Sequence, residues 1–210
     1  VLKVKDSFNT DLNVICNSDT DNGNSRILLS NFRLDGNKET ISFGGQVGIY
    51  FYKVGSGNGS SAIPGAKIEK LFVENFRERG IYLFYSSNNI ISNNTVQRNY
   101  EGMMLESCTN NTITDNIVQG NYLGIRIYTG SKNTISGNIV EGNGDNGITL
   151  THTSNTTVSG NTSQGNNYGI LISGDSPKNT ISGNVFQGNR EHGVYCYPCR
   201  NTTISGNTIQ

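Results

Sequence analysis

Hydrophobic and polar residues alternate in short runs along most of the chain, and these runs recur at a fixed interval. The segment from Asn133 to Leu150 contains one complete unit, in which the runs TIS, IVE and GITL are separated by bends rich in asparagine and glycine. Alternation with a period of two predicts β-strands, and the unit lacks the 3.6-residue period of an amphipathic helix. Each unit therefore predicts three short strands.

Three columns of identical residues define the repeat, with successive members 22 to 24 residues apart. The first asparagine column consists of Asn94, Asn116, Asn138, Asn161, Asn184 and Asn207, and the second of Asn99, Asn121, Asn143, Asn166 and Asn189. A glycine column opens the third strand, at Gly80, Gly102, Gly124, Gly147, Gly169 and Gly193. Three strands per unit at this period are typical of a parallel β-helix. Chain length divided by the period predicts about nine coils, stacked about 4.8 Å apart.

The asparagine columns have a structural explanation. Asparagine tolerates the left-handed backbone of a tight bend, and stacked amides can donate to the next coil. We therefore expect asparagine ladders at the corners. The copy at residues 68–83 places Leu71 and Phe76 where the asparagines would stand.

The N-terminal part is less regular. Strand-like runs occur at residues 1–4 and 12–16, twice within residues 26–37, and at 47–53, and a Gly/Ser-rich loop is inserted at 54–66. We expect one domain over residues 1–210. The chain begins with a strand-like run and stops inside a repeat, which predicts either a segment of a longer protein or open ends that self-associate end to end or laterally.

Composition narrows the partners. Only 33% of the residues are hydrophobic, below the roughly 45–50% of globular proteins (a share that also counts glycine), which suits the narrow core of a solenoid. Sixteen basic and sixteen acidic residues cancel, so no excess charge favours nucleic acid. No apolar run approaches the roughly 20 residues that span a bilayer, so we expect no membrane insertion.

The repeat also carries a family resemblance. Units of the form N-T-I-S-G-N-x-V-x-G-N…G-I-x-L resemble the repeats of the pectate-lyase-like superfamily over roughly residues 27–210. The resemblance implies an all-β, right-handed, single-stranded parallel β-helix. The superfamily includes polysaccharide lyases, polygalacturonase-type hydrolases, alginate epimerases, phage tailspikes and periplasmic copper-site maturation proteins, so it fixes the fold but not the activity. Ca²⁺ is a cofactor that the resemblance allows, although no cofactor is evident in the sequence.

A β-helix has no interior cavity, so function must lie on an outer face or in loops. In the G-I-x-L strand the x residue points outward, which gives the column Tyr82, Met104, Arg126, Thr149, Leu171 and Tyr195. Five tyrosines fall along this edge and predict a surface that stacks against sugar rings, since aromatic faces suit that contact. The predicted substrate-binding residues are Arg79 and the tyrosines Tyr82, Tyr100, Tyr122, Tyr168 and Tyr195.

The same edge supplies candidate catalytic residues. The polygalacturonase-type members resemble it at Asp145, Glu191, His192 and Gly193, but their adjacent aspartate pair is missing, because Asn146 follows Asp145. Inverting glycosidases hold two carboxylates about 6.5–9.5 Å apart. We expect Glu101 to lie two coils from Asp145, and Asp145 two coils from Glu191, near that range.

A lyase or epimerase would instead use a base and cations against a uronate carboxylate. Arg79, Arg126 and His192 suit those roles, with Tyr100 or Tyr122 as proton donor. Across both alternatives the candidate catalytic residues are Glu101, Arg126, Asp145, Glu191 and His192.

The sequence predicts no metal site. The pair Asp19 and Asp21 is too small a carboxylate set for calcium. Cys196 and Cys199 form a C-x-x-C pair that fits a local disulfide or two thiols, and their spacing with His192 does not define a copper site.

Two functions from different classes remain. The first is a secreted or cell-surface protein that engages a polysaccharide along the tyrosine-lined edge, as a lyase, hydrolase or epimerase. The second is a non-catalytic structural or adhesive solenoid, in which the regular repeat is itself the function.

Overall fold

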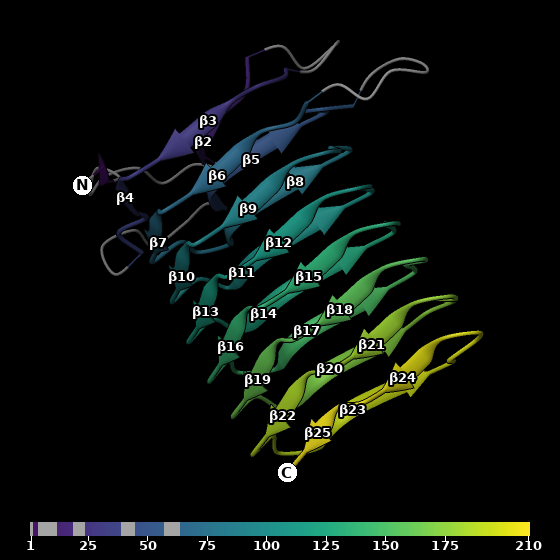
Figure 1. The fold of residues 1–210 in the computed structure, drawn as a ribbon. Helices are drawn as coiled ribbons and strands as arrows, with labels where there is room; N and C mark the ends of the chain where they lie inside the picture. The colour runs from purple at the N-terminus through teal and green to yellow at the C-terminus, as the bar shows by residue number, and fades with distance from the viewer. Residues whose placement is uncertain (1, 4–11, 19–23, 39–44, 57–63) are drawn as a thin grey trace.

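The computed structural model describes residues 2–3, 12–18, 24–38, 45–56 and 64–210. In these segments the regular structure consists of 25 short β-strands without any helix (Figure 1). The described residues accordingly hold no helix of the length and hydropathy that a bilayer span requires. The all-β solenoid expected from the repeat is confirmed: the chain is a parallel β-helix of three sheets.

The strands stack into three parallel sheets, to each of which a coil contributes one strand. Sheet 1 contains β1 (Leu2–Lys3), β4 (Arg33–Asp35), β7 (Phe72–Glu74), β10 (Thr95–Gln97), β13 (Ile117–Gln119), β16 (Ile139–Glu141), β19 (Thr162–Gln164), β22 (Val185–Gln187) and β25 (Thr208–Ile209). Sheet 2 contains β2 (Leu12–Cys16), β5 (Gln46–Tyr52), β8 (Arg79–Phe84), β11 (Glu101–Glu106), β14 (Leu123–Tyr128), β17 (Asn146–Thr151), β20 (Tyr168–Ser173) and β23 (His192–Tyr197). Sheet 3 contains β3 (Leu28–Ser30), β6 (Lys67–Glu69), β9 (Ile90–Ser92), β12 (Thr112–Thr114), β15 (Thr134–Ser136), β18 (Thr157–Ser159), β21 (Thr180–Ser182) and β24 (Thr203–Ser205).

The number of regular coils is smaller than predicted. Six complete coils follow the period, from β6–β8 to β21–β23, and the prediction of about nine is too high for them. The coil β3–β5 is longer, since Leu28 pairs with Lys67 rather than with a residue 22 or 23 positions on. Partial coils with β1–β2 and β24–β25 extend the stack at its two ends. Residues 57–63 of the inserted loop lie outside the described residues.

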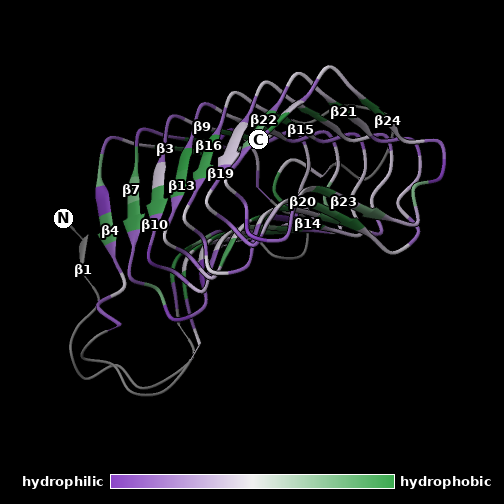
Figure 2. Ribbon diagram, turned by 90° about the horizontal axis from the view of Figure 1, so that it is seen from below, coloured by the Kyte–Doolittle hydropathy of each residue, from purple (hydrophilic) through white to green (hydrophobic). Residues whose placement is uncertain are grey.

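The core is a narrow column of mostly aliphatic side chains inside the coils. In Figure 2 the hydrophobic residues lie mainly on the strands and the hydrophilic ones on the connecting bends. Each short strand of sheets 1 and 3 points its middle residue inward, as Ile113 on β12 and Val118 on β13 do. Ile113 stacks in register between Ile91 and Ile135 of the neighbouring coils. One or two apolar residues per strand therefore suffice for the core, which explains the low hydrophobic content.

Asparagine ladders close two corners, as the sequence predicts. In the first, the Nδ2 of Asn116 donates to Oδ1 of Asn138 at 2.9 Å, and Asn138 donates in turn to Asn161 at 2.9 Å. The second ladder runs through successive coils along Asn99, Asn121, Asn143, Asn166 and Asn189. Where the columns end, the backbone N–H groups of Leu71 and Phe76 still donate to the asparagine of the next coil. Leu71 and Phe76 lack the amide side chain of the columns, as the sequence predicts, but their backbone N–H groups keep the hydrogen bond to the next coil.

A third ladder was not predicted. Asn89 donates to Asn111 at 2.8 Å and Asn111 to Asn133 at 3.0 Å, at the corner between sheets 2 and 3. Thr156 interrupts this column, and only its backbone N–H continues the pattern, by donating to Asn179.

The glycine column of sheet 2 is explained by close packing. A Cβ on Gly102 would lie 2.8 Å from the carbonyl oxygen of Gly124 and 2.8 Å from a methyl group of Val118. Any side chain at this position would push adjacent coils apart, so only glycine fits.

Candidate functional site

The outer face of sheet 2 carries the side chains that differ from coil to coil. Its central column is the one that the alternation predicts, preceded by Tyr50: Tyr82, Met104, Arg126, Thr149, Leu171 and Tyr195 lie in register on successive strands. Met104 and Thr149 are nevertheless buried, at 3% and 5% exposure. A second outward column opens the strands and includes Arg79, Glu101, Leu123, Asn146, Tyr168 and His192.

Two arginines share one buried carboxylate near the middle of this face. Nε of Arg79 lies 2.7 Å from Glu101 Oε2, and Nη1 of Arg126 lies 2.9 Å from Glu101 Oε1. The Glu101 side chain is 4% exposed, whereas both arginines are about a third exposed. Burial lowers the pKa of Arg79, but its hydrogen bond and charge interaction with Glu101 outweigh that effect, so the pKa is raised. The Arg79 guanidinium is therefore held, charged, at the surface.

Arg126 is the less extensively paired of the two arginines, since among the described carboxylates it pairs with Glu101 alone. Glu101 neutralises one of its two arginines, and a second carboxylate, Glu78, approaches Arg79 at 3.4 Å. Only Nη1 of Arg126 is engaged by Glu101, which leaves most of its N–H donors uncommitted within the described part of the chain. Arg126 is thus the better placed arginine for an anionic ligand.

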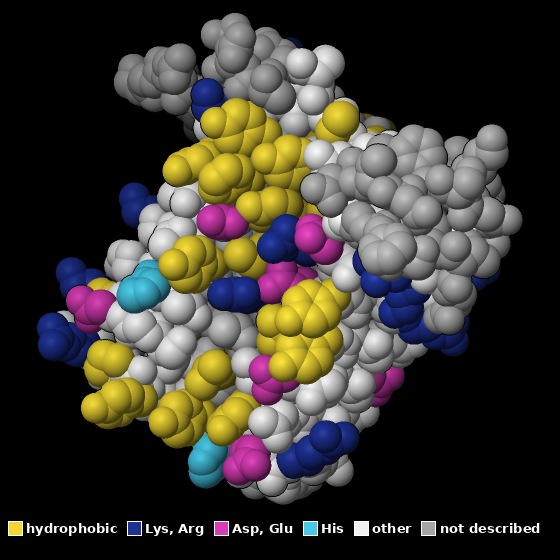
Figure 3. Space-filling view, turned by 180° about the vertical axis from the view of Figure 1, so that it is seen from behind, with side chains coloured by type: hydrophobic (Ala, Val, Ile, Leu, Met, Phe, Trp, Pro, Cys, Tyr) yellow, Lys and Arg dark blue, Asp and Glu magenta, His cyan; other side chains and the backbone are white. Residues whose placement is uncertain are grey.

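The predicted tyrosines form three groups rather than one continuous row. Figure 3 shows hydrophobic side chains gathered in separate patches on one face of the molecule, with basic and acidic side chains between them. Tyr82 packs against Tyr50, with ring centroids 5.1 Å apart. Tyr100 and Tyr122 lie in the bends before β11 and β14 and stack at 4.9 Å. Tyr168 and Tyr195 lie 5.6 Å apart, and His192 stacks on Tyr195 at 5.5 Å.

The first group also contains aromatic residues that the sequence interpretation missed. Tyr52, Phe84 and Tyr85 belong to the same aromatic cluster as Tyr82. The sequence indicates them by the closely spaced aromatic residues of the segments YFY and YLFY. The Tyr82 hydroxyl donates to Glu106 at 2.6 Å, and Arg79 lies 4.5 Å from the centre of its ring. Burial, followed by the hydrogen bond to Glu106, raises the pKa of Tyr82 well above its usual value.

Two hollows beside sheet 2 combine tyrosine rings with basic side chains. One, of about 540 Å³, is lined by Tyr100 and Tyr122 together with Lys38 and Arg77. The other, of about 300 Å³, lies against Tyr50 and Tyr82 and is bordered by Glu78 and Arg79.

The predicted carboxylates do not converge. Glu101 lies opposite Leu123, whereas Asp145 belongs to the column one residue earlier and donates its N–H to the carbonyl of Tyr122. Glu101 and Asp145 are two coils apart, as expected, but they occupy neighbouring columns rather than the same one, because consecutive residues of an extended chain lie in different columns. Asp145 and Glu191 do share a column through Asn167, two coils or roughly 10 Å apart.

The remaining candidates lie away from the arginine cluster. Glu191 and His192 are exposed near the last complete coil, and His192 contacts Tyr168 and Tyr195 rather than a carboxylate. Three coils separate His192 from Arg126, or about 14 Å along the stack. Of the five predicted catalytic residues, only Glu101 and Arg126 are in contact.

Soft metal ligands are dispersed in the described residues. Cys196 and Cys199 form a disulfide, which removes both thiolates. Burial raises the pKa of the Cys108 thiol to about 12, so it stays protonated. No group of three or more His, Cys, Asp and Glu residues occurs in the part of the chain that the structure describes, and Asp19 and Asp21 lie outside it.

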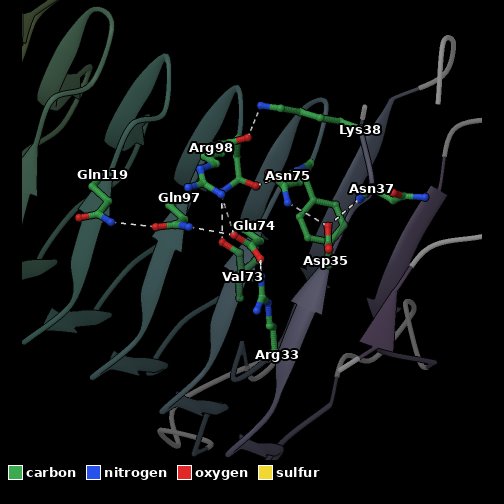
Figure 4. Close-up of polar contacts among 12 residues, drawn as sticks. Arg33, Asp35, Asn37, Lys38, Val73, Glu74, Asn75, Gln97, Arg98 and Gln119 are labelled. Atoms are coloured by element: carbon green, nitrogen blue, oxygen red, sulfur yellow. Dashed lines mark hydrogen bonds and ion pairs between the residues drawn. The ribbon is translucent and has the colours of Figure 1, made fainter. Parts of the chain in front are cut away.

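A polar groove of about 630 Å³ on sheet 1 was also missed. Its floor is a column that includes Gln97, Gln119, Glu141, Gln164 and Gln187. Figure 4 shows its start, where Gln119 donates to Gln97 at 2.8 Å and Gln97 donates to the buried Glu74 at 2.8 Å. Arg33 also bonds to Glu74. The signal in the sequence was the recurrent glutamine or glutamate that ends the second strand of each unit.

Comparison with known proteins gives one family and a shared fold. The model of a family described as "Periplasmic copper-binding protein (NosD)" matches residues 30–210. No curated protein matches the chain.

Solved structures of other proteins share the fold. The chain is similar to the periplasmic alginate epimerase AlgG, with 17% identity and a TM-score of 0.70, over 85% of this chain and 47% of that one. It is similar to the enzymatically active domain of tailspike protein 2 of bacteriophage CBA120, with 21% identity and a TM-score of 0.60, over 87% of this chain and 34% of that one. The chain thus spans less than half of either structure, and the likeness concerns the fold alone.

Proposed function

The chain belongs to the NosD family of periplasmic copper-binding proteins, and from that premise we propose that this β-helix acts in the cell envelope, where it binds an acidic polysaccharide across the outer face of sheet 2. Two kinds of support meet in this proposal. The family description points to the envelope, and a structural relative, AlgG, is an epimerase of alginate. The side chains on sheet 2 supply the chemistry.

The observation that carries the proposal is the pairing of tyrosine rings with basic groups. Tyr100 and Tyr122 border the same hollow as Lys38 and Arg77. Rings of this kind present flat apolar surface to a sugar, and ammonium or guanidinium groups bind its carboxylate through charge-assisted hydrogen bonds. A polymer that carries both rings and carboxylates fits such a surface better than a neutral glycan or an anion without rings.

Copper does not fit the described residues as a resident metal. Copper favours thiolate, thioether and imidazole ligands. In the described segments, the disulfide occupies Cys196 and Cys199, Cys108 is a buried thiol, and Cys16 is a single exposed thiol on β2. Met103 and Met104 are buried on β11, and His152 and His192 lie on different coils. We therefore derive no step through copper from this chain.

Binding is the function proposed, and the arrangement favours uronate chemistry over glycoside hydrolysis. Both oxygens of Glu101 are bound to arginines, so this carboxylate is poorly suited to act as a general acid. Elimination or epimerisation at a uronate needs the sugar carboxylate neutralised, and Arg126 is placed for that role. Since His192 is about 14 Å away along the stack, we assign no base.

A panel of uronate and neutral polysaccharides tests the proposal. Calorimetric titration should show saturable binding of at least one uronate polymer and weak or absent binding of neutral ones. Turnover would appear in the same samples as ultraviolet absorbance of unsaturated products, as new reducing ends, or as a changed uronate epimer by NMR. Absence of binding to every glycan would reject the proposal and favour a structural solenoid.

The tyrosine groups give a second test. Tyr122→Ala and Tyr168→Ala should each weaken binding of the preferred uronate polymer about fivefold, because loss of a ring contact costs about 1 kcal/mol. Both rings lie outside the core, so thermal unfolding should stay near the wild-type temperature. Unchanged affinity in both variants would remove the tyrosines from the binding surface.

A further inference from the structure

The column of amide and carboxylate side chains on the floor of the sheet 1 groove is interrupted at one point. Its first members lie in register on successive strands, in the order Glu74, Gln97, Gln119, Glu141 and Gln164. The amides of Gln97, Gln119 and Gln164 each donate at 2.8 Å to the preceding member of the column. Between Gln119 and Glu141 the described residues supply no such hydrogen bond.

Counting donors explains the interruption. A carboxylate only accepts hydrogen bonds, and a glutamine can direct its amide NH₂ group to only one of its two neighbours along the column. The two glutamines between Glu74 and Glu141 therefore have two NH₂ groups for three intervals. Figure 4 shows the outcome, in which the nitrogen of Gln119 faces Gln97 and its oxygen is turned away. Gln119 Oε1 and the Glu141 carboxylate are left as adjacent acceptors, without a donor from the described residues between them.

The charge of Glu141 is also uncompensated. Glu74, the other carboxylate of the column, is fully buried and pairs with Arg33 and Arg98. Glu141 is half-buried, and no basic side chain of the described segments lies within ion-pair distance of it. A ligand group that fills the gap must therefore donate hydrogen bonds, and a positive charge on it would be stabilised by Glu141.

The groove gives a ligand access to this gap. Gln119 and Glu141 both line its volume of about 630 Å³. The position after each column member is Arg98 on one coil and glycine on the next four, Gly120, Gly142, Gly165 and Gly188. A Cβ on Gly120 or Gly142 would meet no atom of the described residues within 4 Å, so the rim is open beside the gap. The four glycines extend over roughly 14 Å of the stack, which lets an elongated molecule lie along the axis.

We propose that this groove is a second binding site, which takes an amino sugar with its ammonium group between Gln119 and Glu141. An ammonium group carries three N–H donors and one positive charge, so it supplies both the hydrogen bonds and the charge that the column lacks. The amides beside the gap keep a further N–H and a further lone pair for ring hydroxyls, which favours an amino sugar over a simple polyamine. The site lies on another sheet than the acidic-glycan surface and goes beyond that proposed function.

The decisive variant is Glu141→Gln, which removes the negative charge and supplies the missing donor within the column. Its thermal unfolding temperature should therefore hold or rise. Its calorimetric affinity for a glucosamine trisaccharide with free amino groups should fall at least about tenfold, as expected for a lost charge-assisted hydrogen bond. Glu69→Gln removes the same charge from sheet 3 and should keep the affinity within twofold. A lower unfolding temperature with unchanged affinity would assign Glu141 a purely structural role.

Two further ligands identify the group that binds. The N-acetylated trisaccharide keeps the rings but has no ammonium group, so it should bind wild type at least about tenfold more weakly. Spermidine carries ammonium groups without rings, and it should bind more weakly than the amino sugar while still depending on Glu141. Equal affinity for the acetylated ligand would overturn the ammonium site, and equal, Glu141-dependent affinity for spermidine would overturn its assignment to a sugar.

Failure of this site differs from failure of the proposed function. Absence of amine binding to wild type, or full affinity in Glu141→Gln, would overturn the site on sheet 1. Neither result bears on the proposed function, because that function is tested separately with uronate polymers.

Discussion

Sheets 2 and 3 share one core but differ on their outer faces. In sheet 3 the outward residue that opens each strand is threonine from β12 to β24, at Thr112, Thr134, Thr157, Thr180 and Thr203. In sheet 2 the central outward residue changes in every coil, from Met104 through Arg126, Thr149 and Leu171 to Tyr195. Residue types at positions that stabilise the coil are repeated from coil to coil, whereas residue types at positions without a structural role vary. The variation on sheet 2 is where binding chemistry can be placed.

The largest expected effect comes from breaking a repeated position. Asn138→Ala removes an amide that makes five hydrogen bonds at a buried corner. Several buried groups then lose their partners, at about 1–3 kcal/mol each, and we expect the free energy of unfolding to fall by about 3–6 kcal/mol. Chemical denaturation measures this. Thr134→Ala on sheet 3 is the control, at about 1 kcal/mol or less; equal losses would contradict a special role for the ladder.

A smaller effect is expected on the varied face of sheet 2. Glu101→Gln removes the negative charge that Arg79 and Arg126 share. Both partly exposed arginines then lose their ion pair with Glu101. We expect a loss of about 1–3 kcal/mol in the free energy of unfolding, less than for a fully buried pair. Glu69→Gln breaks the more exposed Lys67 pair, at 2.8 Å, and should cost under about 1 kcal/mol. An equal cost for both variants would show that burial of Glu101 adds nothing.

The smallest effect concerns pH. Because burial and Glu106 raise the pKa of Tyr82 in the folded protein, the protonated phenol contributes stability below about pH 10, the pKa of an unfolded tyrosine. That contribution declines as the pH rises above this value, since unfolding then releases a proton. Thermal unfolding of Tyr82→Phe should therefore vary less between pH 9 and 11 than that of wild type. The same slope in both proteins would assign the alkaline loss to other groups, such as Tyr50.

Most of the fold could be predicted from the sequence because the repeat encodes it directly. The asparagine columns indicate the corners, and alternation indicates which residues point inward. The coil number was overestimated, since the period does not hold between Leu28 and Lys67. The third ladder was missed because Thr156 interrupts its column and hides the regularity.

The site was less predictable because it depends on the conformations of long side chains that reach from one coil to the next. Alternation places Arg126 and Glu101 on one face, but their contact arises from side-chain conformations that no sequence pattern specifies. The burial of Thr149 likewise depends on its larger neighbours on the strands at either side. The tyrosines were identified, whereas their division into three groups followed only from the structure.

The central claim is that the varied face of sheet 2, and no other face, binds an acidic glycan. Its most direct test compares Arg126→Ala with Lys67→Ala, which removes an equal charge from sheet 3, by titrating both variants with the preferred oligouronate. Arg126→Ala should weaken binding at least about tenfold, as expected for lost charge-assisted hydrogen bonds, while Lys67→Ala stays within twofold of wild type. Equal losses in the two variants, or full affinity in Arg126→Ala, would contradict the claim.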